Sequence, residues 1–268
     1  MIKNFNRKIL LLVFLFFSLG NVVVVDGQTA LSSVKENVFD VGEELNYKLK
    51  YGFITAAEAT LRIESSDVQF DGKDVFHLVA TGKTAGTFDI FYKVRNRYDS
   101  YIDQKTLLPF LYTENIREGG YSRQDKARFY QNDRKVVTNK DTYKGSEQTF
   151  DVISSYYFAR SLDVNSIRQG DKFILKYFLN DAITPMEIQY VGKERVCTSL
   201  GTFNCLKFSP SIQPGRIFKK NSKLYLWITD DANRIPIKAE VEILIGSITL
   251  ELESAKGLKF PSSSMIQD

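Results

Sequence analysis

The strictest pattern in this chain is a period of two that runs through Phe39 to Glu64. From Leu45 to Phe53 every second residue is apolar or aromatic, and the residues between them are polar, charged or glycine. Such alternation places one face of an extended strand in a core and the other face in water. After a break at Ala56-Ala57 the alternation resumes in the same phase over residues 59–63. Two such runs joined by a short break predict an antiparallel hairpin.

Similar alternation recurs along the chain and is interrupted by turn-forming pairs such as Asp71-Gly72 and Gly119-Gly120. We expect one long alternating strand over residues 88–102 and another over residues 235–252. In the second, the apolar phase flips at Gly246, which predicts a bulge or a sharp bend. The pattern predicts a mainly antiparallel all-β protein whose sheet is strongly bent or closed into a barrel-like half-shell.

One segment departs from the strand pattern. Residues 149–162 carry apolar side chains on two faces of a helix, and Asp151 lies near its start, where an anion suits the helix dipole. A helix that is apolar on two faces packs inside a protein, because a surface helix has only one apolar face. We therefore expect one wedged α-helix around residues 149–162.

Residues 1–27 have the features of a signal peptide. Three basic residues precede an apolar run from Ile9 to Leu19, and cleavage can follow Gly20 or Gly27. The alternative is an uncleaved anchor, for which the interrupted stretch of residues 9–25 is short. We expect the protein to be periplasmic or secreted and its mature form to have no membrane span.

After the leader we expect a loose N-terminal lead over residues 28–37, a single β-rich domain over residues 38–258 and a disordered tail over residues 259–268. The chain has 36 basic and 32 acidic residues, and the leader contains three of the basic ones. If cleavage follows Gly20, the mature chain has 33 basic and 32 acidic residues and is nearly neutral. Its charge therefore gives no reason to expect a nucleic acid partner.

The two cysteines, Cys197 and Cys205, flank a predicted turn with the sequence CTSLGTFNC. If the loop is centred on Gly201, the two side chains face each other across a hairpin. Export permits a disulfide there. Two small buried thiols are the alternative, because cysteine is often fully buried.

Catalytic and cofactor motifs are sparse. His77 is the only histidine; it lies inside the predicted strand of residues 75–81, and the chain has no G-x-S-x-G motif. These features favour a structural histidine over a catalytic one. One histidine and two cysteines beside a turn do not make a zinc site, and no phosphate-binding glycine loop precedes a helix. We expect no metal and no cofactor.

Acidic side chains offer one route to catalysis. Glu43, Glu58, Asp230 and Asp231 could act as a pair of carboxylates in glycan cleavage if the fold brought two of them together. Asp230-Asp231 could also bind calcium, but the segment TDDANRIP is typical of a turn between two strands.

Two further features have both structural and functional interpretations. The segment from Arg216 to Lys223 carries four cations and no acid, so it could contact anionic lipid headgroups or acidic polysaccharide. A solvated loop is the simpler interpretation. Trp227, the only tryptophan, could stack on a sugar, but its place in an alternating run favours the core.

Several segments occur together in order: VGEELNYKLKYGFITAAEATLRI, KVRNRYDSYID, TFDVISSYYFAR, LGTFNCLKFSP and LWITDDANRIPIKAEVEILIGSITLEL. This combination resembles domain of unknown function 3108, a bacterial envelope family, over residues 38–258. Ala57 departs from the family pattern, which has glycine there. The resemblance implies a β-rich periplasmic protein and supplies no catalytic residues.

These observations lead to one main expectation and two alternatives. We expect a non-catalytic envelope protein that binds an apolar ligand such as a lipid, or a protein partner, between the curled sheet and the helix. The segments expected to surround this space are the runs 75–81 and 173–178, which are apolar on both faces, the helix, and the bent last strand. The first alternative is a glycan hydrolase or lyase that uses the carboxylates named above. The second is a structural assembly factor that binds protein through an exposed sheet edge.

Overall fold

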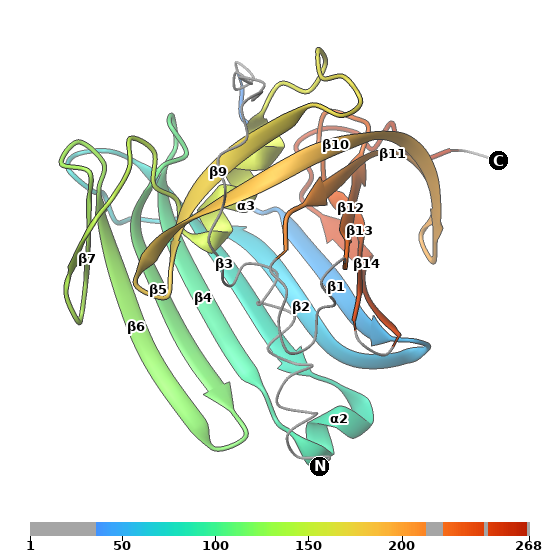
Figure 1. Ribbon diagram of the computed structural model, residues 1–268, viewed down its shortest axis with the longest axis horizontal. Helices are drawn as coiled ribbons and strands as arrows, with labels where there is room; N and C mark the ends of the chain where they lie inside the picture. The colour runs from blue at the N-terminus through green and yellow to red at the C-terminus, as the bar shows by residue number, and fades with distance from the viewer. Residues whose placement is uncertain (1–35, 213–221, 244–245, 267–268) are drawn as a thin grey trace.

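The structure is a computed structural model that describes residues 36–212, 222–243 and 246–266. Within these residues fourteen antiparallel strands form one sheet, and two helices accompany it (Figure 1). This confirms the predicted mainly antiparallel all-β fold. The strands are β1 (Glu44–Tyr51), β2 (Ile54–Glu64), β3 (Val75–Thr84), β4 (Arg95–Asp103), β5 (Pro109–Glu118), β6 (Tyr121–Tyr130), β7 (Lys135–Thr138), β8 (Thr142–Lys144), β9 (Lys172–Leu179), β10 (Ala182–Thr198), β11 (Gly201–Pro210), β12 (Leu224–Thr229), β13 (Pro236–Glu242) and β14 (Ser247–Lys256). The helices are α2 (Gly86–Phe91) and α3 (Val152–Ser161).

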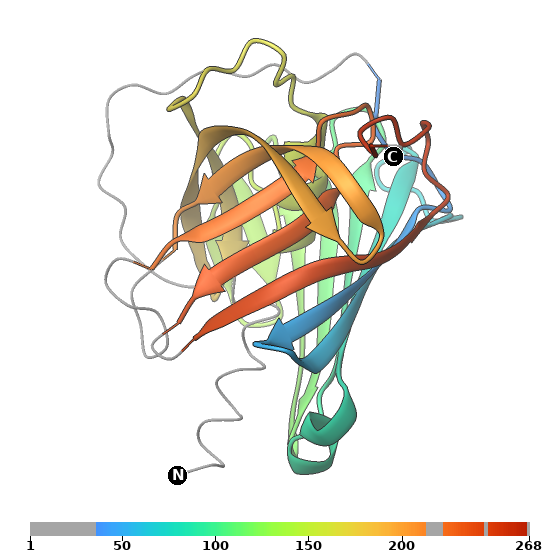
Figure 2. The same cartoon turned by 90° about the vertical axis from the view of Figure 1, so that its right-hand side faces the viewer.

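The two halves of the chain meet in the middle of the sheet. The strand order runs from β8 through β1 to β14 and on to β9. The first and last strands in the sequence, β1 and β14, are therefore neighbours in the sheet. Their register places Leu49 opposite Leu250. The sheet curls strongly around α3 without closing into a complete ring of strands (Figures 1 and 2).

The hairpin predicted from the period of two is formed by β1 and β2. Leu45 and Leu49 are fully buried, as their phase predicts. The turn consists of Gly52 and Phe53, since Tyr51 pairs with Ile54. Ala56 and Ala57 therefore belong to β2 and not to a break between strands. Phe53, which the alternation would bury, is 95% exposed at the tip of the turn.

Helix α3 lies inside the curl of the sheet, as expected for a wedged helix (Figure 2). Its first turn is fixed by Asp151, whose carboxylate accepts hydrogen bonds from the backbone N–H groups of Ile153 and Ser154 at 2.8 and 2.9 Å. Ser154 completes a capping box by accepting from the backbone N–H of Asp151. Tyr157 is fully buried and packs edge-on against Phe39, with ring centroids 4.9 Å apart.

The segment before α3 links the edge strand β9 to the turn between β6 and β7. The backbone of Phe150 exchanges hydrogen bonds with β9, accepting from the N–H of Phe178 at 2.7 Å and donating to the carbonyl of Lys176 at 3.0 Å. On its other side, the carbonyl of Thr149 accepts from Gln131, just after β6, at 2.8 Å. Residues 149 and 150 thus connect β9 with the hairpin of β6 and β7.

Two predicted long strands are wrong in their outlines. Residues 88–102 do not form one strand, because α2 occupies residues 86–91 and β4 begins at Arg95. A helical bond of 2.9 Å from the N–H of Tyr92 to the carbonyl of Phe88 closes α2. Residues 235–252 form two strands, β13 and β14, which pair with each other. The phase flip at Gly246 therefore marks a chain reversal and not a bulge.

The C-terminal tail is a second correction. Residues 259–266 were expected to be disordered, but they pack against the start of β11. The carbonyl of Ser264 accepts from the N–H of Asn204, and the N–H of Ile266 donates to the carbonyl of Thr202, both at 2.8 Å. These bonds extend the sheet where β12 does not reach β11. Polar composition alone does not show such docking.

The predicted signal peptide, residues 1–27, lies outside the described residues, as does most of the N-terminal lead. Among the residues that are described, neither helix has the length and apolar character needed to cross a membrane.

Candidate ligand cavity between α3 and the sheet

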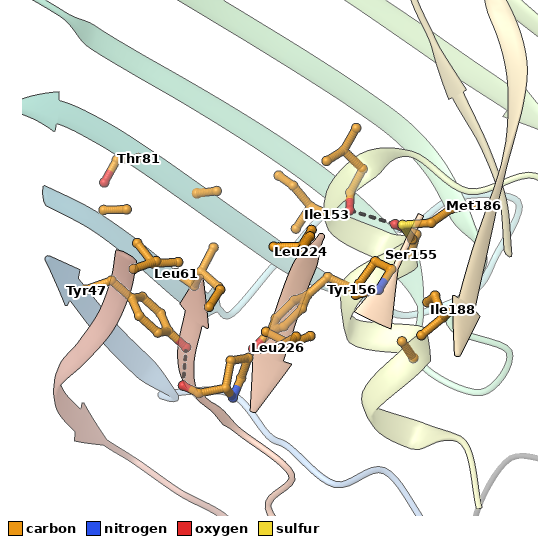
Figure 3. A pocket seen from close by; sticks show the side chains of 18 residues that line it. Tyr47, Leu61, Thr81, Ile153, Ser155, Tyr156, Met186, Ile188, Leu224 and Leu226 are labelled. Atoms are coloured by element: carbon orange, nitrogen blue, oxygen red, sulfur yellow. Dashed lines mark hydrogen bonds between the residues drawn. The ribbon is translucent and has the colours of Figure 1, made fainter. Parts of the chain in front are cut away.

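A cavity of about 210 Å³ lies between α3 and the inner face of the curled sheet (Figure 3). None of its eighteen described lining residues is charged. They come from α3 and from strands in both halves of the chain. The lining is Tyr47, Ala59, Leu61, Ala80, Thr81, Val152, Ile153, Ser155, Tyr156, Ala159, Met186, Ile188, Pro210, Leu224, Leu226, Pro236, Ala239 and Leu250.

Small side chains create this space. Ala59, Ala80 and Ala239 lie on three different strands, and they are buried and line the cavity. Native cores pack densely, with few voids larger than a water molecule. Larger side chains at these three inner positions would fill the space beside α3, and alanine leaves it empty.

Two hydroxyl groups of the lining are engaged with the protein itself, whereas the buried hydroxyl of Tyr156 has no hydrogen-bond partner among the described residues. The hydroxyl of Tyr47 donates to the carbonyl of Pro236 at 3.2 Å, and the hydroxyl of Ser155 donates to the carbonyl of Val152 at 2.8 Å (Figure 3). Burial raises the pKa of Tyr156 to about 12, so this side chain is neutral at physiological pH. The cavity is therefore suited to an apolar molecule.

The helix wall of the cavity is anchored at both ends. Near its start, Asp151 accepts a hydrogen bond of 2.6 Å from the hydroxyl of Ser100 on β4. Near its end, Arg160 forms a buried ion pair with Glu43, just before β1. Burial alone would lower the pKa of Arg160, but its interactions with Tyr156 and Glu43 outweigh burial and raise it. The arginine is therefore charged in the folded protein.

Of the segments expected to surround the ligand space, the structure brings together the helix, the run 75–81 and the end of the chain. Ala80 and Thr81 of the run 75–81 line the cavity, and so does Leu250 of β14. The run 173–178 does not reach the cavity. It is apolar on both faces because Phe178 packs outward against Phe129 and Tyr143, across the gap between the sheet edges.

Sequence reasoning missed most of the opposite wall. Met186 and Ile188 of β10 and Leu224 and Leu226 of β12 line the cavity. Met186 and Ile188 alternate with polar residues in the sequence, but a period of two says only that a side chain is buried. It does not say whether the side chain meets a neighbour or an empty space.

His77 has the structural role that was favoured. Its Nε2 lies 2.8 Å from the carboxylate of Asp99 on the next strand. Its ring stacks on that of Tyr101, with centroids 4.3 Å apart. The pKa of Asp99 is lowered because hydrogen bonds from His77 and Arg97 outweigh its burial.

The four carboxylates considered for glycan cleavage have separate partners. Glu43 pairs with Arg160, Glu58 with Lys83 at 3.0 Å, and Asp230 with Lys193 at 2.7 Å. Asp231 accepts hydrogen bonds within its own turn from Thr229 and Asn233, at 2.8 and 3.0 Å. TDDANRIP is thus the turn between β12 and β13, and none of the four acids lines the cavity.

The cysteines do not face each other. The turn between β10 and β11 is formed by Ser199 and Leu200, since Thr198 pairs with Gly201. In this register Cys197 lies opposite Thr202, and Cys205 lies opposite Glu194. Both thiols are free; Cys197 is exposed and Cys205 is buried. The cysteines miss each other because the turn is centred between Ser199 and Leu200, one and a half residues before Gly201, so that each cysteine lies three residues from the position opposite the other.

Trp227 is in the core, as favoured, with 6% of its surface exposed. Most of the predicted basic cluster, namely Arg216, Lys219 and Lys220, lies outside the described residues. Lys223 is described, and it is exposed at the start of β12.

The curled sheet, the enclosed helix and the apolar space between them define a barrel-like all-β protein with an internal cavity. The chain belongs to the family described as protein of unknown function, DUF3108, whose pattern matches residues 46–253. This confirms the resemblance found in the sequence. No curated protein matches the chain.

The solved structures similar to this chain include the following three. One is a beta-barrel-like protein of the domain of unknown function DUF1849 from Brucella abortus, at 9% identity and a TM-score of 0.54, covering 81% of this chain and 98% of that one. A protein of Bacteroides fragilis, described as exported and YmcC-like in fold, has 14% identity and a TM-score of 0.37, covering 81% and 97%. A protein of Parabacteroides distasonis, described as a lipoprotein, has 12% identity and a TM-score of 0.35, covering 82% and 99%. The first of these shows a shared barrel-like fold.

Proposed function

We propose that this protein is an exported, non-catalytic envelope protein that holds an apolar chain, such as an acyl chain of a lipid, in the cavity between α3 and the sheet. The observation that carries the proposal is the uncharged lining of a cavity of about 210 Å³. An apolar cavity of about 150 Å³ in another protein stays dry and binds benzene. A larger cavity of this character is therefore suited to part of a hydrocarbon.

The size of the cavity limits what it can hold. Pockets that enclose whole drug-sized ligands measure about 300–1,000 Å³. The cavity beside α3 is smaller, so it suits one apolar segment of a molecule whose polar part remains outside. A lipid or a lipid-modified partner combines an apolar chain with a polar part in this way.

The cellular location that we propose rests on the sequence of the leader. Lys3, Arg7 and Lys8 precede the apolar run that starts at Ile9, and this order is typical of an export signal. We propose that the mature protein is periplasmic or secreted. Detection of the protein in the periplasmic or extracellular fraction, with its N-terminus after Gly20 or Gly27, would support this part of the proposal.

The first test is native mass spectrometry with lipid extraction on protein purified from the envelope after export. We expect a co-purifying apolar molecule that leaves on denaturation. The second test measures binding of a fluorescent polyunsaturated fatty acid, cis-parinaric acid, to the purified protein. An increase in its fluorescence that saturates at one molecule per chain is expected.

Cavity-filling variants make the test specific. Ala80→Phe and Ala239→Phe each place an aromatic ring into the cavity, and both should weaken probe binding at least tenfold. Ala182→Phe, at the exposed start of β10, is the matched control and should bind as the wild type does. Far-ultraviolet circular dichroism and thermal midpoints establish that each variant is folded. Equal affinity in all three folded variants would refute the cavity as the binding site.

A further inference from the structure

Four apolar side chains are exposed at one end of the curled sheet. Phe53 is 95% exposed and Ile54 is 43% exposed, both at the turn between β1 and β2. Ile90 and Phe91 of α2 are 82% and 69% exposed. We call these four residues the apolar rim. The turn and α2 lie together at the lower end of the molecule in Figures 1 and 2.

The rim is held in place by polar contacts. Asp89 of α2 accepts two hydrogen bonds from Arg95 of β4, at 2.6 and 3.0 Å. It also accepts from the hydroxyl of Thr84 at 2.5 Å. The N–H of Ala85 donates to the carbonyl of Ala56 on β2, at 3.0 Å. Exposure of the apolar side chains on α2 is therefore a fixed feature of the fold.

Apolar packing connects the rim with the ligand cavity. Phe88, on the inner side of α2, packs against a buried cluster at the same end of the sheet. That cluster includes Leu224 and Ala239, which also line the cavity. A continuous apolar region thus runs from α2 to the proposed ligand.

Exposed apolar patches on soluble domains mark interaction sites. A stable protein–protein interface needs about 800 Å² of complementary surface on each partner. The rim offers two narrow projections, a two-residue turn and a six-residue helix. A lipid bilayer requires no complementary shape, because apolar side chains enter its interface individually. The geometry therefore favours a membrane over a folded partner.

Charge at this end of the sheet also suits a lipid surface. Lys93, directly after α2, and Lys223, directly before β12, are exposed cations, and Glu242 is an exposed acid at the same end. Cations near the surface of a membrane are attracted to anionic headgroups.

We propose that the apolar rim docks on the surface of a lipid bilayer, so that an acyl chain can pass between the membrane and the cavity. This inference rests on the proposed function, since the cavity supplies the reason for docking. Phe53 and Phe91 enter the interface, and Phe88 of the same helix as Phe91 packs against the cluster that borders the cavity.

Co-sedimentation with vesicles of phosphatidylethanolamine and phosphatidylglycerol tests the rim directly. The wild type should sediment with the vesicles. Phe53→Ser and Phe91→Ser should each weaken partitioning about tenfold, because the burial of one aromatic side chain changes an equilibrium by at least this factor. Val68→Ser is the matched control: Val68 is 51% exposed in the loop at the opposite end of β2, and its substitution should leave partitioning unchanged.

A reporter experiment locates the contact. Phe53→Trp and Val68→Trp share the same background from the buried Trp227. Brominated phospholipids in the vesicles should quench the added fluorescence of Phe53→Trp and not that of Val68→Trp. Equal quenching of the two, equal sedimentation of the rim variants and the wild type, or no sedimentation of the wild type would each overturn the proposal.

The rim and the cavity can fail separately. If both proposals hold, Phe53→Ser keeps its affinity for cis-parinaric acid and loses vesicle binding, whereas Ala239→Phe shows the reverse. A rim variant that abolishes a dimer formed by the wild type without vesicles would assign the rim to contact between two copies, and would overturn membrane docking. If neither the wild type nor any variant binds the probe, the proposed ligand function of the cavity is refuted. Vesicle binding by the rim can still be measured in that case.

Discussion

Arg160 of α3 and Glu43, which directly precedes β1, form a bidentate ion pair across 117 residues of sequence. The two N···O distances are 2.6 and 2.8 Å, and the side chains are 2% and 0% exposed. Arg160 also donates to the carbonyl of Asn233 at 2.9 Å. The pair fixes the end of α3 to the middle of the sheet, and hence one wall of the cavity.

Removal of either partner should be strongly destabilising. Glu43→Gln or Arg160→Met leaves a buried charge without its partner, so each should lower the free energy of unfolding by about 3–5 kcal/mol in urea titrations. The double variant should lose less than the sum of the two. Arg134→Met, which removes the exposed pair with Glu147, is the control and should cost less than about 1 kcal/mol. Additive losses would show that the two side chains act independently.

Asp151 should make stability depend on pH. Burial raises the pKa of its carboxyl above the ordinary value of 3.8, although Ser100 and Ser154 hydrogen-bond to it. The folded state therefore retains a proton that the unfolded chain has already lost, and stability falls as pH rises from 3.8 through the raised pKa.

Asp151→Asn removes this titration and can keep the cap. In urea titrations at a series of pH values, its stability relative to the wild type should increase across that window and then stay level. Asp151→Ala should lose about 0.5–2 kcal/mol of capping energy. Asp67→Asn, at an exposed site in a loop, controls for the change in net charge. A constant difference between Asp151→Asn and the wild type at every pH would contradict this prediction.

The two thiols should be chemically distinct and unlinked. Cys197 is exposed and should react rapidly with a thiol reagent in the folded protein. Cys205 is 1% exposed, and burial with nearby acids raises its pKa to about 12, so it should react only after unfolding. Reducing agent should not change the thermal midpoint. An intact mass lower by two hydrogens, restored on reduction, would instead reveal a disulfide.

Gly257 should tolerate no side chain. Its φ is +62°, and a Cβ atom there would overlap the carbonyl group of Gly42. Gly72 is the matched control, with a φ of +72° and nothing within 4 Å of the same atom. Gly72→Ala should cost about 1–2 kcal/mol, the strain of a left-handed conformation. Gly257→Ala should cost clearly more in thermal unfolding, and equal losses would show that the overlap is relieved at no cost.

Local patterns were sufficient for the first hairpin and for α3. The hairpin of β1 and β2 follows from alternation, since burial of one face is a property of each strand alone. The start of α3 follows from Asp151, because a cap involves residues only two or three positions apart.

Local patterns failed where two structures share the same periodicity. The segment 88–102 alternates well enough for a strand, yet its first residues form α2, held by Asp89 and Arg95. The turn between β10 and β11 is centred one and a half residues before the expected one, which shifts every cross-strand partner by three residues. Cys197 and Cys205 were separated in this way.

The sequence by itself therefore determined the all-β class, the hairpins at its turn signals, the wedged helix and the family. These properties depend on contacts within short segments. Only the tertiary structure decided the pairing of β1 with β14, the ion pair of Glu43 with Arg160, the docked tail and the cavity. Each of these depends on residues far apart in the chain, and a cavity is defined by side-chain volume that is missing where several distant strands converge.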